Sequence, residues 1–341
     1  MDPNAGKSKL INRLGPEELR KRLAAEDFKR RTLSFYRYGT IADPQAYRDA
    51  LYLRWTELQA LGRIYLAREG INAQMNVPEP HWENFISDLK QDAYLTEVPL
   101  KIALAEEAPS FLKLTIKVRS KIVADGLPDD AFDVSNVGRH LNAQEWNQAL
   151  EAGALVVDMR NHYESEIGHF ENALLPRSET FREELPEVLS MLKGKEDQKI
   201  LLYCTGGIRC EKTSAYLKHH GFKDVNQLHG GIIDYARQIK TRELPNRFKG
   251  KNFVFDQRLG ERVSEEVISH CHQCGSPCDT HVNCANVDCN LLFLQCPNCA
   301  EKYAGCCSTA CREELGLPSA KRRPKKGAQR IFQSHRPFDR P

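Results

Sequence analysis

Residues 199–218 decide the fold of this chain, and their sequence is Lys199-Ile-Leu-Leu-Tyr-Cys-Thr-Gly-Gly-Ile-Arg-Cys-Glu-Lys-Thr-Ser-Ala-Tyr-Leu-Lys218. The first five form a strongly apolar run, which predicts a buried strand. Residues 211–218 predict a helix that has an acid in its first turn. Between them, Cys204-Thr-Gly-Gly-Ile-Arg-Cys210 forms a glycine-rich turn that delivers a cysteine to the start of a helix.

This turn places Cys204 where a thiolate is stabilised. Backbone N–H groups at a helix N-terminus lack partners and the helix dipole favours negative charge, so the pKa of such a thiol falls below the usual ~8.5. Arg209 adds a positive charge. We therefore predict that Cys204 is catalytic, and that the active-site loop consists of Thr205, Gly206, Gly207, Ile208 and Arg209. Cys210 has two interpretations: a thiol that resolves an oxidised Cys204, or a packing residue.

Strand and helix patterns alternate through residues 141–240, which predicts an α/β domain with a parallel sheet. The ligand site of such a sheet lies at the carboxyl ends of its strands. One of these ends is Val156-Val-Asp158-Met-Arg160. We expect Asp158 and Arg160 to support the Cys204 loop, and a purely structural ion pair is the alternative.

The pattern strand–Cys-x4-Arg–helix resembles the active-site loop of rhodanese-like sulfurtransferases. Further matching segments are Asp158-Met-Arg160, residues 163–173 and Gly230-Gly231. The resemblance covers about residues 140–240 and implies that Cys204 carries a persulfide. A related phosphatase branch uses His-Cys-x5-Arg. Here the spacing is one residue shorter and Tyr203 precedes the cysteine, which favours sulfur over phosphate chemistry.

Residues 31–120 predict a second domain of the ferredoxin-like type. Strands are expected at 32–38, 63–68, 71–77 and 112–118, and helices at 44–61 and 81–89. Sheets of this type often bind RNA through exposed aromatic residues, so Tyr36 and Tyr38 are candidates for stacking on bases. Packing under a neighbouring domain is the alternative. Residues 1–30 are expected to form an N-terminal arm, and residues 121–140 a turn-rich linker.

Residues 241–320 form a cysteine-rich unit, because ten of the twelve cysteines fall between positions 271 and 311. Two Cys-x2-Cys knuckles, 21 residues apart, predict a structural zinc site at Cys271, Cys274, Cys296 and Cys299. A second ion is possible at the remaining six, namely Cys278, Cys284, Cys289, Cys306, Cys307 and Cys311. Reduced packing cysteines or a few disulfides are the alternatives.

Charge is distributed unevenly along the chain. Residues 321–341 hold eight Lys or Arg and one Asp, a net charge of +7, whereas the remaining chain has a net charge of −4. We expect a basic, disordered tail that attracts phosphates or serves only for solubility. No apolar run reaches the ~18 residues of a membrane span, and the first residues lack the apolar stretch of a signal peptide. We expect no membrane partner and a cytoplasmic location.

The whole arrangement is an α/β and α+β multidomain chain, and it closely resembles the bacterial tRNA uridine hydroxylases. The resemblance rests on segments throughout the chain, namely residues 67–73, 122–126, 158–163, 203–210, 250–256 and 271–275. It implies that tRNA is the partner and that the wobble uridine at position 34 becomes 5-hydroxyuridine. It also implies that molecular oxygen is the co-substrate and that Cys204 is essential. A rhodanese-type sulfurtransferase and a non-enzymatic RNA-binding module are the alternatives. Nothing in the sequence identifies a redox cofactor.

Overall fold

The computed structural model describes residues 10, 12, 14–103, 111–256, 258–316 and 333–335. The chain divides into two compact units. Unit 1 comprises residues 1–126 with 256–258, and unit 2 comprises residues 127–255 with 259–341. In the described part of the chain, no helix is long and apolar enough to cross a membrane.

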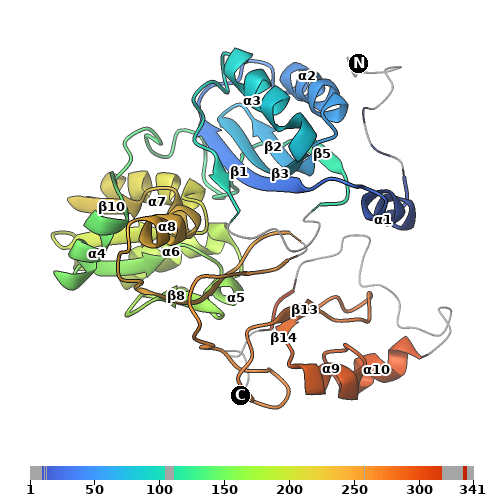
Figure 1. The fold of residues 1–341 in the computed structure, drawn as a ribbon. Helices are drawn as coiled ribbons and strands as arrows, with labels where there is room; N and C mark the ends of the chain where they lie inside the picture. Colours follow the sequence, from blue (N-terminus) through green and yellow to red (C-terminus); the bar gives the residue numbers. More distant parts are fainter. Residues whose placement is uncertain are drawn as a thin grey trace. The chain divides into compact units, whose positions relative to one another are not determined.

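Unit 1 contains a five-stranded sheet with two helices on one face (Figure 1). The strand order β4-β1-β3-β2 is that of a ferredoxin-like fold, with β5 added beside β2. Its elements are α1 (Pro16–Ala24), β1 (Arg30–Tyr38), α2 (Pro44–Glu57), β2 (Leu61–Ala67), β3 (Gly70–Pro78), η1 (Glu79–His81), α3 (Trp82–Gln91), β4 (Lys101–Ile102) and β5 (Leu114–Val118).

One strand has a different place from the expected one. The segment predicted as the last ferredoxin-like strand is β5, which runs parallel to β2 at the sheet edge. The fourth position belongs to β4, where Ile102 and Lys101 pair with Leu33 and Ser34 of β1. A two-residue strand has no alternating pattern for sequence reasoning to detect.

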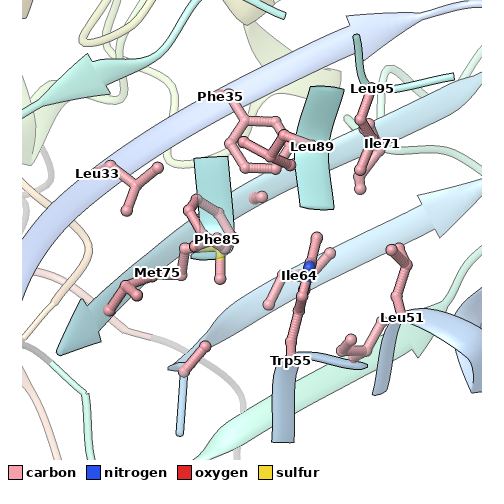
Figure 2. Close-up of a cluster of buried hydrophobic side chains, with 14 of the residues drawn as sticks. Leu33, Phe35, Leu51, Trp55, Ile64, Ile71, Met75, Phe85, Leu89 and Leu95 are labelled. Atoms are coloured by element: carbon pink, nitrogen blue, oxygen red, sulfur yellow. The ribbon is translucent and has the colours of Figure 1, made fainter. Parts of the chain in front are cut away.

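The core of unit 1 lies between the sheet and helices α2 and α3 (Figure 2). Alternate residues of β1, Leu33 and Phe35, point into this core, and Trp55 of α2 packs edge-on against the Phe35 ring. Because strand side chains alternate between faces, Tyr36 and Tyr38 lie on the face away from the helices. Both are only partly buried.

Unit 2 begins with the expected α/β domain. Its four strands are all parallel and follow the order β6-β10-β9-β7. The elements are β6 (Arg139–Leu141), α4 (Ala143–Glu151), β7 (Leu155–Asp158), α5 (His162–Ser165), β8 (Gly168–Phe170), α6 (Phe181–Met191), β9 (Lys199–Tyr203), α7 (Ile208–His219), β10 (Asp224–Leu228) and α8 (Gly231–Thr241). The central strands β9 and β10 place the Cys204 loop at the carboxyl edge of the sheet.

The cysteine-rich part of unit 2 begins with β11. This strand pairs with β8 and so joins the cysteine-rich part to the α/β domain. Its elements are β11 (Phe248–Asn252), β12 (Glu261–Arg262), β13 (His281–Asn283), β14 (Leu292–Leu294), α9 (Pro297–Tyr303) and α10 (Thr309–Leu315). Residues 333–335 depart from the expected disorder of the tail, because Gln333 and His335 form backbone hydrogen bonds with Leu292 of β14. The rest of the tail and residues 1–9 of the arm lie outside the described residues.

Candidate active site

The loop after β9 turns Cys204 back toward the start of α7. Gly207 is the N-cap residue and has a φ of 97°, a left-handed conformation that glycine adopts without steric cost. Its backbone N–H donates to the Cys204 Sγ at 3.0 Å. Thr205, Gly206 and Ile208 are partly exposed, while Cys204 is 1% exposed. The sequence-predicted loop is therefore an anion cradle around a buried sulfur.

Four groups around Cys204 favour its thiolate. Burial by itself raises the pKa of the Cys204 thiol. Against burial, the Cys210 thiol donates a hydrogen bond to the Cys204 sulfur, Arg209 contributes positive charge, and the N–H groups of Arg209 and Gly207 point at the sulfur. Together these four groups lower the pKa of Cys204 to about 6. Burial and the neighbouring Cys204 sulfur raise the pKa of Cys210 well above its usual value. At neutral pH the pair is thus one thiolate and one thiol.

The Gly230-Gly231 segment holds the other side of the loop. The N–H of Ile232 donates to the Cys204 carbonyl at 3.0 Å, and that of Ile233 donates to the Thr205 carbonyl at 3.2 Å. A Cβ on Gly231 would lie 2.5 Å from the Cys204 carbonyl oxygen, and the residue has a φ of +67°. Only glycine allows α8 to approach the loop this closely.

The Arg209 guanidinium, which lies near the Cys204 sulfur, also forms an ion pair with Glu164 of α5. The Arg209 Nη2 to Glu164 Oε1 distance is 2.8 Å, and Nη1 donates to the Met159 carbonyl at 2.9 Å. The Arg209 guanidinium also lies 5.6 Å from the centre of the Phe255 ring. Sequence reasoning missed Glu164, since nothing in the pattern places a short helix after β7 against the loop.

Asp158 and Arg160 form a fully buried ion pair. Arg160 Nε donates to Asp158 Oδ1 at 2.8 Å, and the Tyr203 hydroxyl donates to Asp158 Oδ2 at 2.7 Å. Tyr203 is the residue before Cys204, so the pair ties the end of β7 to the end of β9. These contacts favour support of the strand ends by the Asp158–Arg160 pair.

A second buried acid near the loop, Glu184 of α6, was also missed. It is fully buried, and neither carboxyl oxygen has a hydrogen-bond partner among the described residues. Burial raises its pKa well above the usual value, and the charges of Arg209 and Cys204 also act on it. The available signal was an acid on the same helix face as the buried Phe181, Leu185 and Val188.

The segment after β11 forms a wall beside the loop. The Thr205 hydroxyl donates to the Phe253 carbonyl at 3.4 Å, and Phe253 packs against Tyr163 in a small apolar cluster with Leu292 and Leu294. The loop is therefore bounded partly by residues that lead into the cysteine-rich part.

The four cysteines predicted to bind zinc come together. The sulfurs of Cys271, Cys274, Cys296 and Cys299 all lie within 4.8 Å of one another. Four thiol ligands at such spacing suit a tetrahedral zinc ion. A second group, Cys284, Cys289, Cys307 and Cys311, meets the same criterion. Either group could bind a metal ion.

Three family models match the chain in succession: the UPF0176 acylphosphatase like domain at residues 30–122, the rhodanese-like domain at 142–238 and the rhodanase C-terminal domain at 249–312. These matches confirm the expected fold classes of the first two domains. Acylphosphatase-like and ferredoxin-like describe the same strand order here.

Similar proteins match over nearly the whole length. A tRNA uridine(34) hydroxylase of Leptospira interrogans is 58% identical over 93% of this chain and 87% of its own. Proteins of the same description from Escherichia fergusonii and Cronobacter sakazakii are each 54% identical, over 92% and 94% of this chain and 90% and 92% of theirs. The resemblance inferred from the sequence is confirmed, and the chain belongs to the tRNA uridine(34) hydroxylase family.

Proposed function

We propose that this protein hydroxylates uridine 34 of tRNA to 5-hydroxyuridine, with molecular oxygen as co-substrate and Cys204 as the reactive group. The observation that carries the proposal is the family membership over more than nine-tenths of the chain, 93% in one relative, together with a loop that keeps Cys204 ionised. A tRNA substrate also makes the cytoplasm the expected location.

The geometry supports a role for both loop cysteines. Addition of the Cys204 thiolate to C6 of the uracil would make C5 electron-rich, and so reactive toward an oxidant. After oxygen is bonded to C5, loss of the C5 proton would expel the Cys204 thiolate from C6 and restore the C5=C6 double bond. Placing one oxygen atom of O2 at C5 and releasing the other as water takes two electrons and two protons. Oxidation of the Cys204 and Cys210 thiols to a disulfide would supply both, so uridine, O2 and two thiols balance 5-hydroxyuridine, water and one disulfide.

The neighbouring charges support the same assignment. Arg209 and the loop N–H groups would stabilise anionic sulfur. Asp158 and Arg160 would keep the strand ends in place, and Glu164 would fix the Arg209 guanidinium. Burial raises the pKa of Glu184 well above its usual value, and the charges of Arg209 and Cys204 act on this carboxyl group.

For the tRNA itself, we propose the face of the unit 1 sheet that points away from α2 and α3. The strand register places Tyr36 opposite Asn72, and Asn72 opposite Tyr65, so all three share one face. Lys101 Nζ lies 4.1 Å from the centre of the Tyr36 ring, and Arg119 lies over the Tyr65 ring. The partly exposed rings of Tyr36 and Tyr65 suit stacking on bases, and the exposed Arg119 suits contact with a phosphate, whereas Lys101 is buried.

A sulfurtransferase is the second candidate, and the match to the rhodanese-like domain at residues 142–238 favours it. The same loop N–H groups would stabilise a persulfide on Cys204. The two functions predict different changes in tRNA. Nucleoside mass spectrometry of tRNA from a deletion strain is expected to lose a uridine that is 16 Da heavier, whereas loss of a thiolated base would favour sulfur transfer. Full restoration by Cys204→Ala would contradict both.

A further inference from the structure

Eight of the ten cysteines between residues 271 and 311 occur as four successive pairs, which alternate between two clusters. The pairs are Cys271/Cys274, Cys284/Cys289, Cys296/Cys299 and Cys307/Cys311. The first and third pairs form one group of neighbouring sulfurs, and the second and fourth form the other. We propose that residues 271–311 are a two-zinc module with interleaved ligands, in which the second and fourth pairs bind a second structural ion.

The second cluster has the geometry that this ion requires. The Sγ–Sγ distances are 3.7 Å between Cys289 and Cys307 and 3.6 Å between Cys307 and Cys311. Zinc–sulfur bonds of 2.3 Å in a tetrahedron separate the sulfurs by about 3.8 Å. A disulfide would require about 2.05 Å, so these contacts are not disulfides. Thiolate ligands without oxygen or nitrogen select zinc over the hard cations.

The backbone around the second cluster also suits a metal-bound thiolate. The N–H of Cys307 points at the Cys284 sulfur at 3.4 Å, and Cys284 itself is 3% exposed. Cys311 lies in the first turn of α10, whose N-cap is Ser308. In the first cluster the N–H of Cys296 points at the Cys271 sulfur in the same way, also at 3.4 Å. The two clusters therefore share a ligand arrangement.

Two glutamines connect the clusters. Gln273, inside the first knuckle, donates to the Cys306 and Cys307 carbonyls at 3.0 and 3.1 Å. Gln295, next to Cys296, donates to the Gln273 side-chain oxygen at 2.9 Å and to the Cys306 carbonyl at 3.2 Å. An ion at either cluster thus orders backbone that carries ligands of the other, so we infer that the two ions bind with positive coupling.

The module is in contact with the α/β domain. His272, in the first knuckle, lies 2.7 Å from Glu166, the residue that ends α5. Leu292 and Leu294 of β14 pack with Tyr163 and Ile167. Since α5 carries Glu164, the partner of Arg209, the module supports one wall of the active site. Through this contact, loss of the metal ions would displace an active-site wall and lower activity even if the module does not bind the substrate.

Metal analysis of the full-length protein, purified under reducing conditions, tests the proposal. We expect two zinc ions per chain, and X-ray absorption with four sulfur ligands per zinc at about 2.3 Å. Each of the single variants Cys284→Ser and Cys307→Ser should lower the zinc content to one ion per chain or less. The matched controls are Cys278→Ser and Cys306→Ser, because these buried cysteines lie between the ligands but belong to neither cluster. Both controls should retain two ions.

The wild-type measurement needs no variant, so it decides the proposal even if a variant fails to fold. A content of one zinc or less in the wild type, oxygen or nitrogen ligands in its spectrum, or iron in place of zinc would overturn the proposal. For coupling, we expect a chelator to remove the remaining ion from Cys284→Ser at least ten times faster than the same ion leaves Cys278→Ser. Equal rates would contradict the coupling.

Discussion

The Cys204 loop and the cysteine-rich module use the same side chain in opposite ways. Cys204 has one sulfur neighbour, is surrounded by donors and has a pKa lowered to about 6. Each of the eight cysteines in the two clusters instead has three sulfur neighbours within 4.8 Å. Hydrogen-bond donors around one sulfur prepare a nucleophile, whereas four clustered sulfurs require a cation.

The largest difference between the two regions should appear on replacing single cysteines. Cys204→Ser is expected to lower tRNA hydroxylation more than ~1,000-fold, because a serine hydroxyl does not ionise at neutral pH. Cys278→Ser, in the module but outside both clusters, should keep activity near the wild-type level. Nucleoside mass spectrometry of tRNA from complemented deletion strains measures both. A substantial residual activity in Cys204→Ser would mean that Cys204 is not the essential thiolate.

Removal of the metal ions should lower the stability of the cysteine-rich module. Because binding of a structural zinc ion is part of the folding free energy, stripping zinc with a chelator under reducing conditions should lower the Tm of the module by roughly 10 °C or more. Calorimetry before and after adding zinc back measures the change. An unchanged Tm would mean that the clusters are reduced packing cysteines.

Loop geometry can be disturbed without touching a cysteine. Gly231→Ala places a Cβ 2.5 Å from the Cys204 carbonyl and should reduce activity by about 100-fold, since catalytic groups tolerate little displacement. Gly221→Ala is the matched control, because Gly221 has a φ of +90° but nothing within 4 Å of its Cβ position. The control should lose about 1 kcal/mol of stability and keep its activity. Equal activity in the two variants would contradict the close approach of α8.

The pH dependence of alkylation separates the two kinds of cysteine. Because the pKa of Cys204 is lowered to about 6, its thiolate is present above that pH and is lost as the pH falls through it. The rate of iodoacetamide labelling at Cys204, followed by peptide mass spectrometry, should rise with a midpoint near pH 6 and reach a plateau by about pH 7.5. A midpoint near 8.5 would mean that the loop does not activate the sulfur.

The smallest effect is expected far from any cysteine. Tyr36→Ala should raise the KM for tRNA about tenfold and leave kcat unchanged, since one base stack contributes about 1–3 kcal/mol. Leu53→Ser is the control, because this exposed residue belongs to α2, which covers the opposite face of the sheet. Equal KM values would exclude the sheet face as a tRNA contact.

Local patterns predicted much of this molecule. The apolar run, the paired glycines and the Cys-x4-Arg spacing are all short-range features, and they placed Cys204 correctly at a helix start. The two Cys-x2-Cys knuckles likewise identified the first cluster. These features were predictable because the residues that act together are close in sequence.

What was missed depends on distant packing. Glu164 and Glu184 reach the loop only after α5 and α6 fold onto it, and an isolated acid in a helix has no distinguishing pattern. The two-residue strand β4 exists only through its pairing with β1. The division of the remaining cysteines required the structure too, since spacing alone does not exclude Cys278 or Cys306.

The proposed role of Cys204 is to supply the thiolate through which this protein hydroxylates tRNA. Its most direct test is a reaction of purified protein with unmodified tRNA under ¹⁸O2, followed by mass spectrometry of the nucleosides. We expect ¹⁸O in 5-hydroxyuridine with the wild type and none of this nucleoside with Cys204→Ser. Equal yields from both proteins, or oxygen derived only from water, would contradict it.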